Sequence, residues 1–170
     1  MSYTSREQIE VYRFAWPVAI GVPLLAVFLQ AFLPVQIRFF NILDLPLLVT
    51  IFFGVARRNP MTGLLTGSAI GLLQDSLTHN PLGVYGIAKT FVGFAASSLG
   101  VKIDVENPGS RLIMTFIFFM AHQSIYFSIQ RGLLGQVVAW HWGQELGAGV
   151  ANALVAVVLF AFLDRFKQRT

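Results

Sequence analysis

Six apolar runs follow one another along this chain, with only short polar connections between them. They cover residues 16–35, 42–56, 61–77, 82–101, 112–129 and 146–163. A helix needs about 20 apolar residues to cross the hydrocarbon core of a bilayer, which is about 30 Å thick. Hydrophobic residues form 55% of the 170 residues and charged residues only 12%, a balance outside the range of ordinary soluble domains. The sequence therefore predicts an all-α integral membrane protein with six transmembrane helices in a single polytopic domain, residues 1–170.

The basic residues predict how these helices are oriented. If the runs cross the membrane alternately, nine Lys and Arg side chains fall on one side, and only Arg38 and Arg131 fall on the other. The nine are Arg6, Arg13, Arg57, Arg58, Lys102, Arg111, Arg165, Lys167 and Arg169. Because cytoplasmic loops are enriched in Lys and Arg, both termini are predicted to be cytoplasmic. The first run exceeds the about 7–15 apolar residues of a signal-peptide core, so it is predicted to remain as a span.

The composition and the missing motifs exclude several classes of function. Cysteine is absent, which excludes thiolate catalysis, disulfides and cysteine-ligated metal centres. The chain also lacks a G-x-x-x-x-G-K phosphate loop, an H-E-x-x-H zinc motif and a G-x-S nucleophile motif. The formal net charge is +4, but the basic residues occur in short runs between apolar segments, which does not indicate a nucleic-acid surface. We therefore expect no enzyme activity, no cofactor, no metal site and no nucleic-acid partner.

A row of small residues marks the third apolar run. Gly63, Gly67 and Gly71 recur every four residues and lead to Asp75, so the four positions share one face of a helix. Small residues let helices approach each other closely in lipid. Two interpretations stay open: this face packs against other helices of the chain, or it is kept thin for a partner subunit. The candidates for helix packing or partner contact are Gly63, Gly67, Gly71, Gly83 and Gly93.

Two charged side chains lie inside apolar runs on either side of a predicted hairpin turn. Asp75 precedes the turn at 78–81 and Lys89 follows it. Both residues lie within about three helical turns of this turn, within reach of one long lysine side chain. We predict a buried ion pair between them, because an isolated charge is costly in hydrocarbon. The pair can be a structural clamp, or it can bind a proton, a ligand or a partner.

Polar side chains near the outer ends of the predicted spans are candidates to line a polar cavity. They are His79, Asn80, His122 and Gln123. No two histidines have the spacing of metal ligands. For His122, inside the fifth run, a hydrogen-bonded structural histidine is favoured over a proton relay, which would need more intramembrane carboxylates.

The central third of the chain carries the most specific pattern. Its residues are Asp44-Leu45, 52–58, Gly63, Gly67, 71–75, 81–85 and 89–94. In these residues the chain resembles the rod shape-determining protein MreD family. The resemblance implies a non-catalytic scaffold in the bacterial cytoplasmic (inner) membrane, which serves the cell-elongation complex in rod shape determination and peptidoglycan synthesis. It also implies binding to the bitopic protein MreC, and coupling of MreB filaments to the polymerase RodA and its penicillin-binding transpeptidase.

The predicted six-span architecture also resembles the six-helix fold of the substrate-binding subunits of energy-coupling-factor vitamin transporters. This second resemblance supplies an alternative function, the capture of a small ligand near the outer ends of the spans. Because one fold can host unrelated functions, the architecture by itself does not choose between the two.

Overall fold

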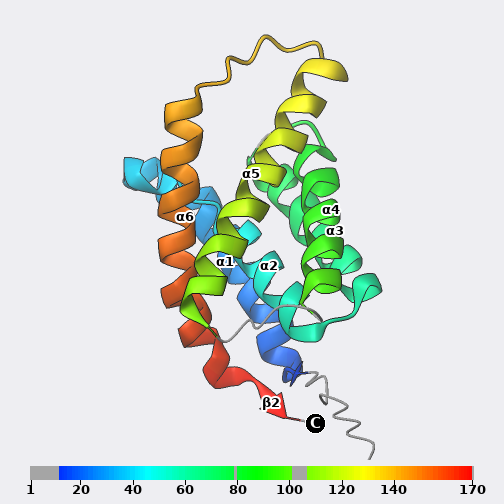
Figure 1. The fold of residues 1–170 in the computed structure, drawn as a ribbon. Coiled ribbons are helices and arrows are strands. Elements are labelled where there is room, and N and C mark those ends of the chain that lie inside the picture. The colour runs from blue at the N-terminus through cyan, green and yellow to red at the C-terminus, as the bar shows by residue number, and fades with distance from the viewer. Residues whose placement is uncertain (1–11, 79, 101–106, 170) are drawn as a thin grey trace, which may run out of the picture.

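The computed structural model describes residues 12–78, 80–100 and 107–169, and over these residues the fold is helical apart from one short strand pair (Figure 1). The α-helices are α1 (Trp16–Gln36), α2 (Leu45–Arg57), α3 (Pro60–Thr78), α4 (Val84–Leu99), α5 (Pro108–Gly132) and α6 (Trp142–Leu163). Two short 3-10 helices, η1 (Arg38–Asn41) and η2 (Asp164–Phe166), follow α1 and α6. The predicted all-α class is confirmed.

The strand pair joins the two ends of the described chain. Strand β1 (Tyr12–Arg13) runs antiparallel to β2 (Gln168–Arg169), with Tyr12 opposite Arg169. The ammonium of Lys167 lies over the Tyr12 ring, 4.5 Å from its centroid. Beside this pair, Asp164 binds both Lys167, at 2.7 Å, and Arg111 of α5, at 2.5 Å. These contacts hold the start of α1, the start of α5 and the end of α6 at one end of the bundle, while the α5–α6 connection lies at the other (Figure 1).

Local sequence signals explain where the central helices begin and end. The Asp44 carboxylate accepts a hydrogen bond from the Leu47 amide at 3.0 Å, which caps the start of α2. Helix α2 ends where Arg58 adopts a left-handed conformation with φ of 52°, and Pro60 then opens α3. The predicted break between the second and third apolar runs therefore lies where the charged pair and the proline indicate it.

Helix α2 forms the centre of the bundle and contacts each of the other five α-helices. Eleven of its 13 residues are buried, and they are Pro46, Leu47, Leu48, Val49, Thr50, Ile51, Phe52, Phe53, Gly54, Val55 and Ala56. By contrast, the outer helices present large apolar side chains at the surface, such as Trp16 at 80% and Val158 at 72% exposure. An apolar perimeter of this kind is the arrangement of a protein whose solvent is lipid.

Three of the six α-helices are long and apolar enough to cross a membrane. They are α1, α5, and α6 together with η2. Helices α2 and α4 are apolar but have only 13 and 16 residues, and α3 has 19 residues that include its three glycines and two buried polar side chains. The predicted spans differ from the helices mainly at their ends: α5 and α6 begin about a turn earlier than the apolar runs, because helical backbone continues into polar residues.

Candidate functional site

Helices α3 and α4 pack backbone against backbone along the glycine row. A Cβ atom on Gly67 or Gly71 would overlap backbone carbonyl groups of α4, and Gly63 and Gly93 face each other's carbonyl groups in the same way. The glycine row of α3 is therefore covered by α4, a helix of the same chain. The interpretation that this face stays open for a partner subunit is wrong, because α4 covers it.

Gly83 has a different role from the other glycines of the predicted set. It is the N-cap of α4 with φ of 102°, and a Cβ atom there would meet nothing within 4 Å. Only glycine adopts this backbone region without strain. The prediction of a packing contact at Gly83 is therefore corrected: the position is required for the turn into α4.

The buried carboxylate of Asp75 caps helix α4 from the neighbouring helix. It accepts hydrogen bonds from the backbone amides of Gly83 at 2.9 Å, Tyr85 at 3.1 Å and Gly86 at 3.1 Å. The Asp75 side chain is fully buried. The first amides of a helix have no partner within the helix and carry partial positive charge, so a carboxylate satisfies them well.

The predicted partner of Lys89 is therefore wrong. Among the described residues its ammonium pairs with Asp44 of the α2 N-cap, at 2.7 Å, and not with Asp75. The amides of α4 occupy the Asp75 carboxylate, while Lys89 lies farther along α4, where that helix packs on α2. The sequence signal for Asp44 was available, because an aspartate before Leu-Pro at the start of an apolar run is a typical N-cap.

Asp44 and Lys89 form the centre of a buried polar cluster that joins four helices. The Lys89 ammonium also lies 3.2 Å from Nε2 of His122 on α5, and 4.6 Å above the ring of Tyr85. On the other side, the Asp44 amide donates to Asn152 of α6 at 2.9 Å. We call these five residues the Asp44 cluster. Lys89, His122 and Asn152 are each 0% exposed, so Lys89 and Asn152 find their partners within the protein, whereas Nδ1 of His122 has no hydrogen-bond partner among the described residues.

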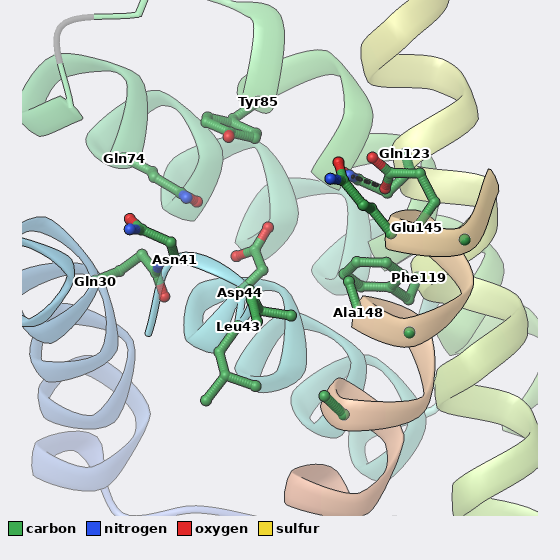
Figure 2. Close-up of a pocket in the computed structure, with 15 residues that line it drawn as sticks. Gln30, Asn41, Leu43, Asp44, Gln74, Tyr85, Phe119, Gln123, Glu145 and Ala148 are labelled. Atoms are coloured by element: carbon green, nitrogen blue, oxygen red, sulfur yellow. Dashed lines mark hydrogen bonds between the residues drawn. The ribbon is translucent and has the colours of Figure 1, made fainter. Parts of the chain in front are cut away.

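A pocket of about 660 Å³ opens beside the Asp44 cluster (Figure 2). Gly143 and Gln144 from the first turn of α6 line it, so it lies in the half of the bundle near the α5–α6 connection and away from the strand pair (Figure 1). All six α-helices or their caps contribute to its wall. The lining residues with polar side chains are Gln30, Asn41, Asp44, Gln74, Tyr85, Gln123, Gln144 and Glu145. Carboxamides thus outnumber every other polar group, and Gln123 donates to the Glu145 carboxylate at 2.8 Å.

A second pocket, of about 760 Å³, shares part of this wall. Gln30, Asn41, Gln74 and Tyr85 line both pockets. The remaining wall of the second pocket comes mainly from α1 and α3, and includes Phe32, Val35, Leu77, Thr78 and Asn80. The two pockets share a polar wall, and the second pocket extends beyond it along apolar side chains of α1 and α3.

The predicted polar cavity is partly reproduced by these pockets. Gln123 lines the first pocket and Asn80 lines the second. His122 lies behind the wall, inside the Asp44 cluster, and lines neither pocket. His79 lies outside the described residues. Sequence reasoning missed Gln30, Gln74 and Glu145, because each belongs to a different helix and only the packing brings them together.

The described residues contain no group of three or more His, Asp and Glu side chains that could hold a metal ion. The chemistry that the arrangement offers is therefore hydrogen bonding and charge pairing, from carboxamides, two carboxylates and a tyrosine. No nucleophile with an adjacent base occurs among the residues that line the first pocket.

Comparison with known proteins identifies the family. The model of the family described as rod shape-determining protein MreD matches residues 12–169, from strand β1 to strand β2. No curated protein and no solved structure matches the chain.

Proposed function

The chain belongs to the rod shape-determining protein MreD family, and from this membership we propose that it is a non-catalytic membrane scaffold of the bacterial cell-elongation complex. Membership implies a role in rod shape determination, and it places the chain among shape-determining membrane proteins, which are not a known enzyme family. The family match over residues 12–169 is the observation that carries the proposal.

We propose that the scaffold crosses the cytoplasmic (inner) membrane six times, with both termini in the cytoplasm. Three long apolar helices support a multi-pass arrangement. The basic residues support the orientation: Arg57, Arg58 and Arg111 lie at the same end of the bundle as the strand pair, whereas Arg131 lies at the end of α5 that points away from it (Figure 1). Of the two shorter helices, α2 is packed inside the bundle, where neighbouring helices surround it, whereas α4 exposes the apolar side chains of Ile87, Phe91 and Phe94.

We propose MreC as the direct partner, with RodA, the penicillin-binding transpeptidase and MreB reached directly or through it. The glycine row does not serve this contact, so a partner helix has to use the outer faces of the bundle. These faces are apolar, as on α1, where Ile20, Leu24 and Phe28 are each at least half exposed. A bitopic partner helix fits such a surface without a polar cost.

The test is complementation together with co-purification. In a rod-shaped bacterium depleted of its own MreD, expression of this chain with its cognate MreC is expected to restore rods, and MreC is expected to co-purify in mild detergent. The Asp75→Ala variant, which leaves three α4 amides without an acceptor, is expected to give round cells. Round cells with the unmodified chain, in the presence of its cognate MreC, would contradict the proposal.

The comparisons do not support the alternative of a vitamin-transporter subunit. Membership in the family assigns no role to the first pocket.

A further inference from the structure

The first pocket contains a buried hydrogen-bond acceptor without a donor. Gln74 is 3% exposed and lines both pockets, and its Oε1 has no hydrogen-bond partner among the described residues. In Figure 2 the end of its side chain points toward the space bordered by Asn41 and Asp44. A buried polar atom without a partner costs free energy, which a ligand that donates a hydrogen bond removes.

The charges of the first pocket exclude acidic ligands. Its ionisable side chains among the described residues are Asp44, Tyr85 and Glu145, and no Lys or Arg is among them. The ammonium of Lys89 neutralises Asp44, whereas Glu145 forms no ion pair with a described residue. A phosphate or carboxylate group would be repelled at Glu145 and would find no cation to bind. The ligand that fits this pocket is therefore not an anion.

The polar groups of the pocket lie on two opposite sides. Figure 2 shows Gln30, Asn41 and Gln74 on one side, and Gln123 with Glu145 on the other. A ligand that meets both sides therefore carries several hydrogen-bonding groups around its rim. A carboxamide offers N–H donors beside a carbonyl acceptor, so the best match is a ligand group that can both donate and accept. Hydroxyl groups have this property.

The size and the apolar part of the wall favour a sugar ring. A volume of about 660 Å³ is that of a small-molecule site and suits a mono- or disaccharide. Tyr85 and Phe119 line the pocket, and the C–H faces of a pyranose pack on aromatic rings, whose faces carry partial negative charge. Gly143 and Gly147 keep the α6 wall open, because a Cβ atom at either position would meet nothing within 4 Å.

We propose that the first pocket binds a neutral saccharide, a hexose or a disaccharide of hexoses. Its hydroxyl groups donate to Gln74 Oε1 on one side and to the Glu145 carboxylate on the other, and the carboxamide N–H groups donate to its oxygen atoms. The hydrogen bond to the charged Glu145 is the stronger of the two. In the topology proposed above, the pocket lies in the outer half of the bundle and takes its ligand from outside the cell.

The test is saturation-transfer NMR of the full chain in lipid nanodiscs, because alkyl glycoside detergents would themselves offer saccharides to the pocket. The neutral probes are glucose, galactose, N-acetylglucosamine and cellobiose, and binding with a Kd of about 1 mM or tighter is expected. Glucuronic acid and galacturonic acid, which carry a carboxylate in place of one hydroxymethyl group, are expected to bind at least about tenfold more weakly than glucose and galactose. Absence of binding by all four neutral probes, or equal binding of the acidic ones, would overturn the proposal.

A capped, uncharged tripeptide is the competing probe, because peptide groups also donate and accept hydrogen bonds. Retention of the sugar in the presence of equimolar tripeptide would support the proposal. Tighter binding of the tripeptide than of any sugar would overturn it in favour of a polypeptide ligand. Nanodiscs leave both membrane faces accessible, so the result does not depend on the proposed topology.

Two variants with matched controls locate the site. Gln74→Leu removes the unpartnered acceptor, and Gly147→Leu adds a side chain at the pocket wall; each is expected to weaken sugar binding at least about fivefold. The first control is Gln130→Leu, because Gln130 is also a buried glutamine with an unpartnered Oε1 but lines neither pocket. The second is Gly21→Leu, because Gly21 has equal space for a Cβ atom and lines neither pocket. Both controls are expected to bind sugar as the unmodified chain does.

A third variant tests the role of charge. Glu145→Gln keeps the size of the side chain and removes the repulsion, so glucuronic acid is expected to bind this variant about as well as glucose does. Folding of all variants is checked by far-UV circular dichroism and gel filtration. Unchanged sugar binding in both Gln74→Leu and Gly147→Leu would overturn the proposal. Cell shape and co-purification of MreC are read separately, so failure of the scaffold function stays distinguishable.

Discussion

The charged side chains inside the bundle show how single residues shape this protein. An ammonium in a hydrocarbon environment needs a carboxylate, and Lys89 obtains one from Asp44, which lies 45 residues away in the sequence. Asp75, the nearer carboxylate in the sequence, instead satisfies the backbone amides that open α4. Asp44 therefore neutralises the Lys89 ammonium and caps its own helix α2, whereas Asp75 caps the neighbouring helix α4.

A double-mutant comparison identifies the partner of Lys89. Replacing Lys89 by Met leaves the Asp44 carboxylate buried without a cation, and loss of one member of a buried ion pair destabilises by about 3–5 kcal/mol. The Lys89→Met/Asp44→Asn double variant is expected to recover most of this loss, because both side chains are then neutral and Asn still caps α2. The measurement is thermal unfolding in detergent, followed by circular dichroism.

The control for this comparison is Lys89→Met/Asp75→Asn. If Asp75 only caps α4, this second change adds to the damage and does not repair it. Recovery with Asp75→Asn, and none with Asp44→Asn, would show that the ion pair predicted from sequence spacing is the right one after all.

At the scale of elements, the α3–α4 hairpin is built on backbone contact. The glycines of α3 remove side-chain atoms where carbonyl groups of α4 pass, so van der Waals contact between the backbones takes the place of side-chain packing. Helix α4 packs on the central helix α2 as well as on α3, and Lys89 therefore lies next to α2. The hairpin thereby positions both the Asp44 cluster and the wall of the pocket that Tyr85 and Gln74 supply.

Enlarging one glycine is expected to separate this hairpin. In Gly67→Leu, the new side chain would meet the Lys89 carbonyl, and overpacking costs about 1–3 kcal/mol, or more where the obstacle is backbone. The matched control is Gly21→Leu in α1, because a Cβ atom at Gly21 meets nothing within 4 Å. The unfolding temperature in detergent is expected to fall for Gly67→Leu and to stay unchanged for Gly21→Leu. Equal unfolding temperatures of the two variants would contradict the close packing.

The whole molecule combines an apolar core that includes several buried polar side chains with a largely apolar outside. Buried polar side chains such as Asn152, Thr115 and Ser97 lie among the apolar core residues, while many large apolar side chains are exposed on the outer helices. In water this distribution would be unfavourable, and in a bilayer it is the expected one. The strand pair and its ion pairs close one end of the bundle, and the pocket occupies the other half.

Single cysteines test the proposed topology, since the natural chain has none. Leu82→Cys and Gln136→Cys lie in exposed connections at the end away from the strand pair, and Met61→Cys lies at the exposed start of α3. In intact cells, a membrane-impermeant maleimide is expected to label the first two, and to label Met61→Cys only after permeabilisation. Labelling of Met61→Cys in intact cells would contradict a crossing of α3 in the proposed direction.

The sequence alone was sufficient for the class of protein, the positions of its helices and its family. These properties follow from local facts: the length of each apolar run, the break from Arg57 to Pro60, and the motif residues that predicted the MreD family, which the family match confirms. Apolar length and helix capping act within a few residues of the chain, so the order of residues is enough to read them.

Only the tertiary structure decided which carboxylate neutralises Lys89, which glycines are covered, and which amides meet in the pocket. Each of these depends on how the helices rotate and cross, and a rotation of one helix changes every partner on its face without any change in its apolar pattern. Asp44, Gln74 and Glu145 belong to three separate segments, and their proximity is a property of the packed bundle. The spacing along the chain favoured an ion pair between Asp75 and Lys89. In the folded chain, however, the Asp75 carboxylate binds the backbone amides at the N-terminus of α4.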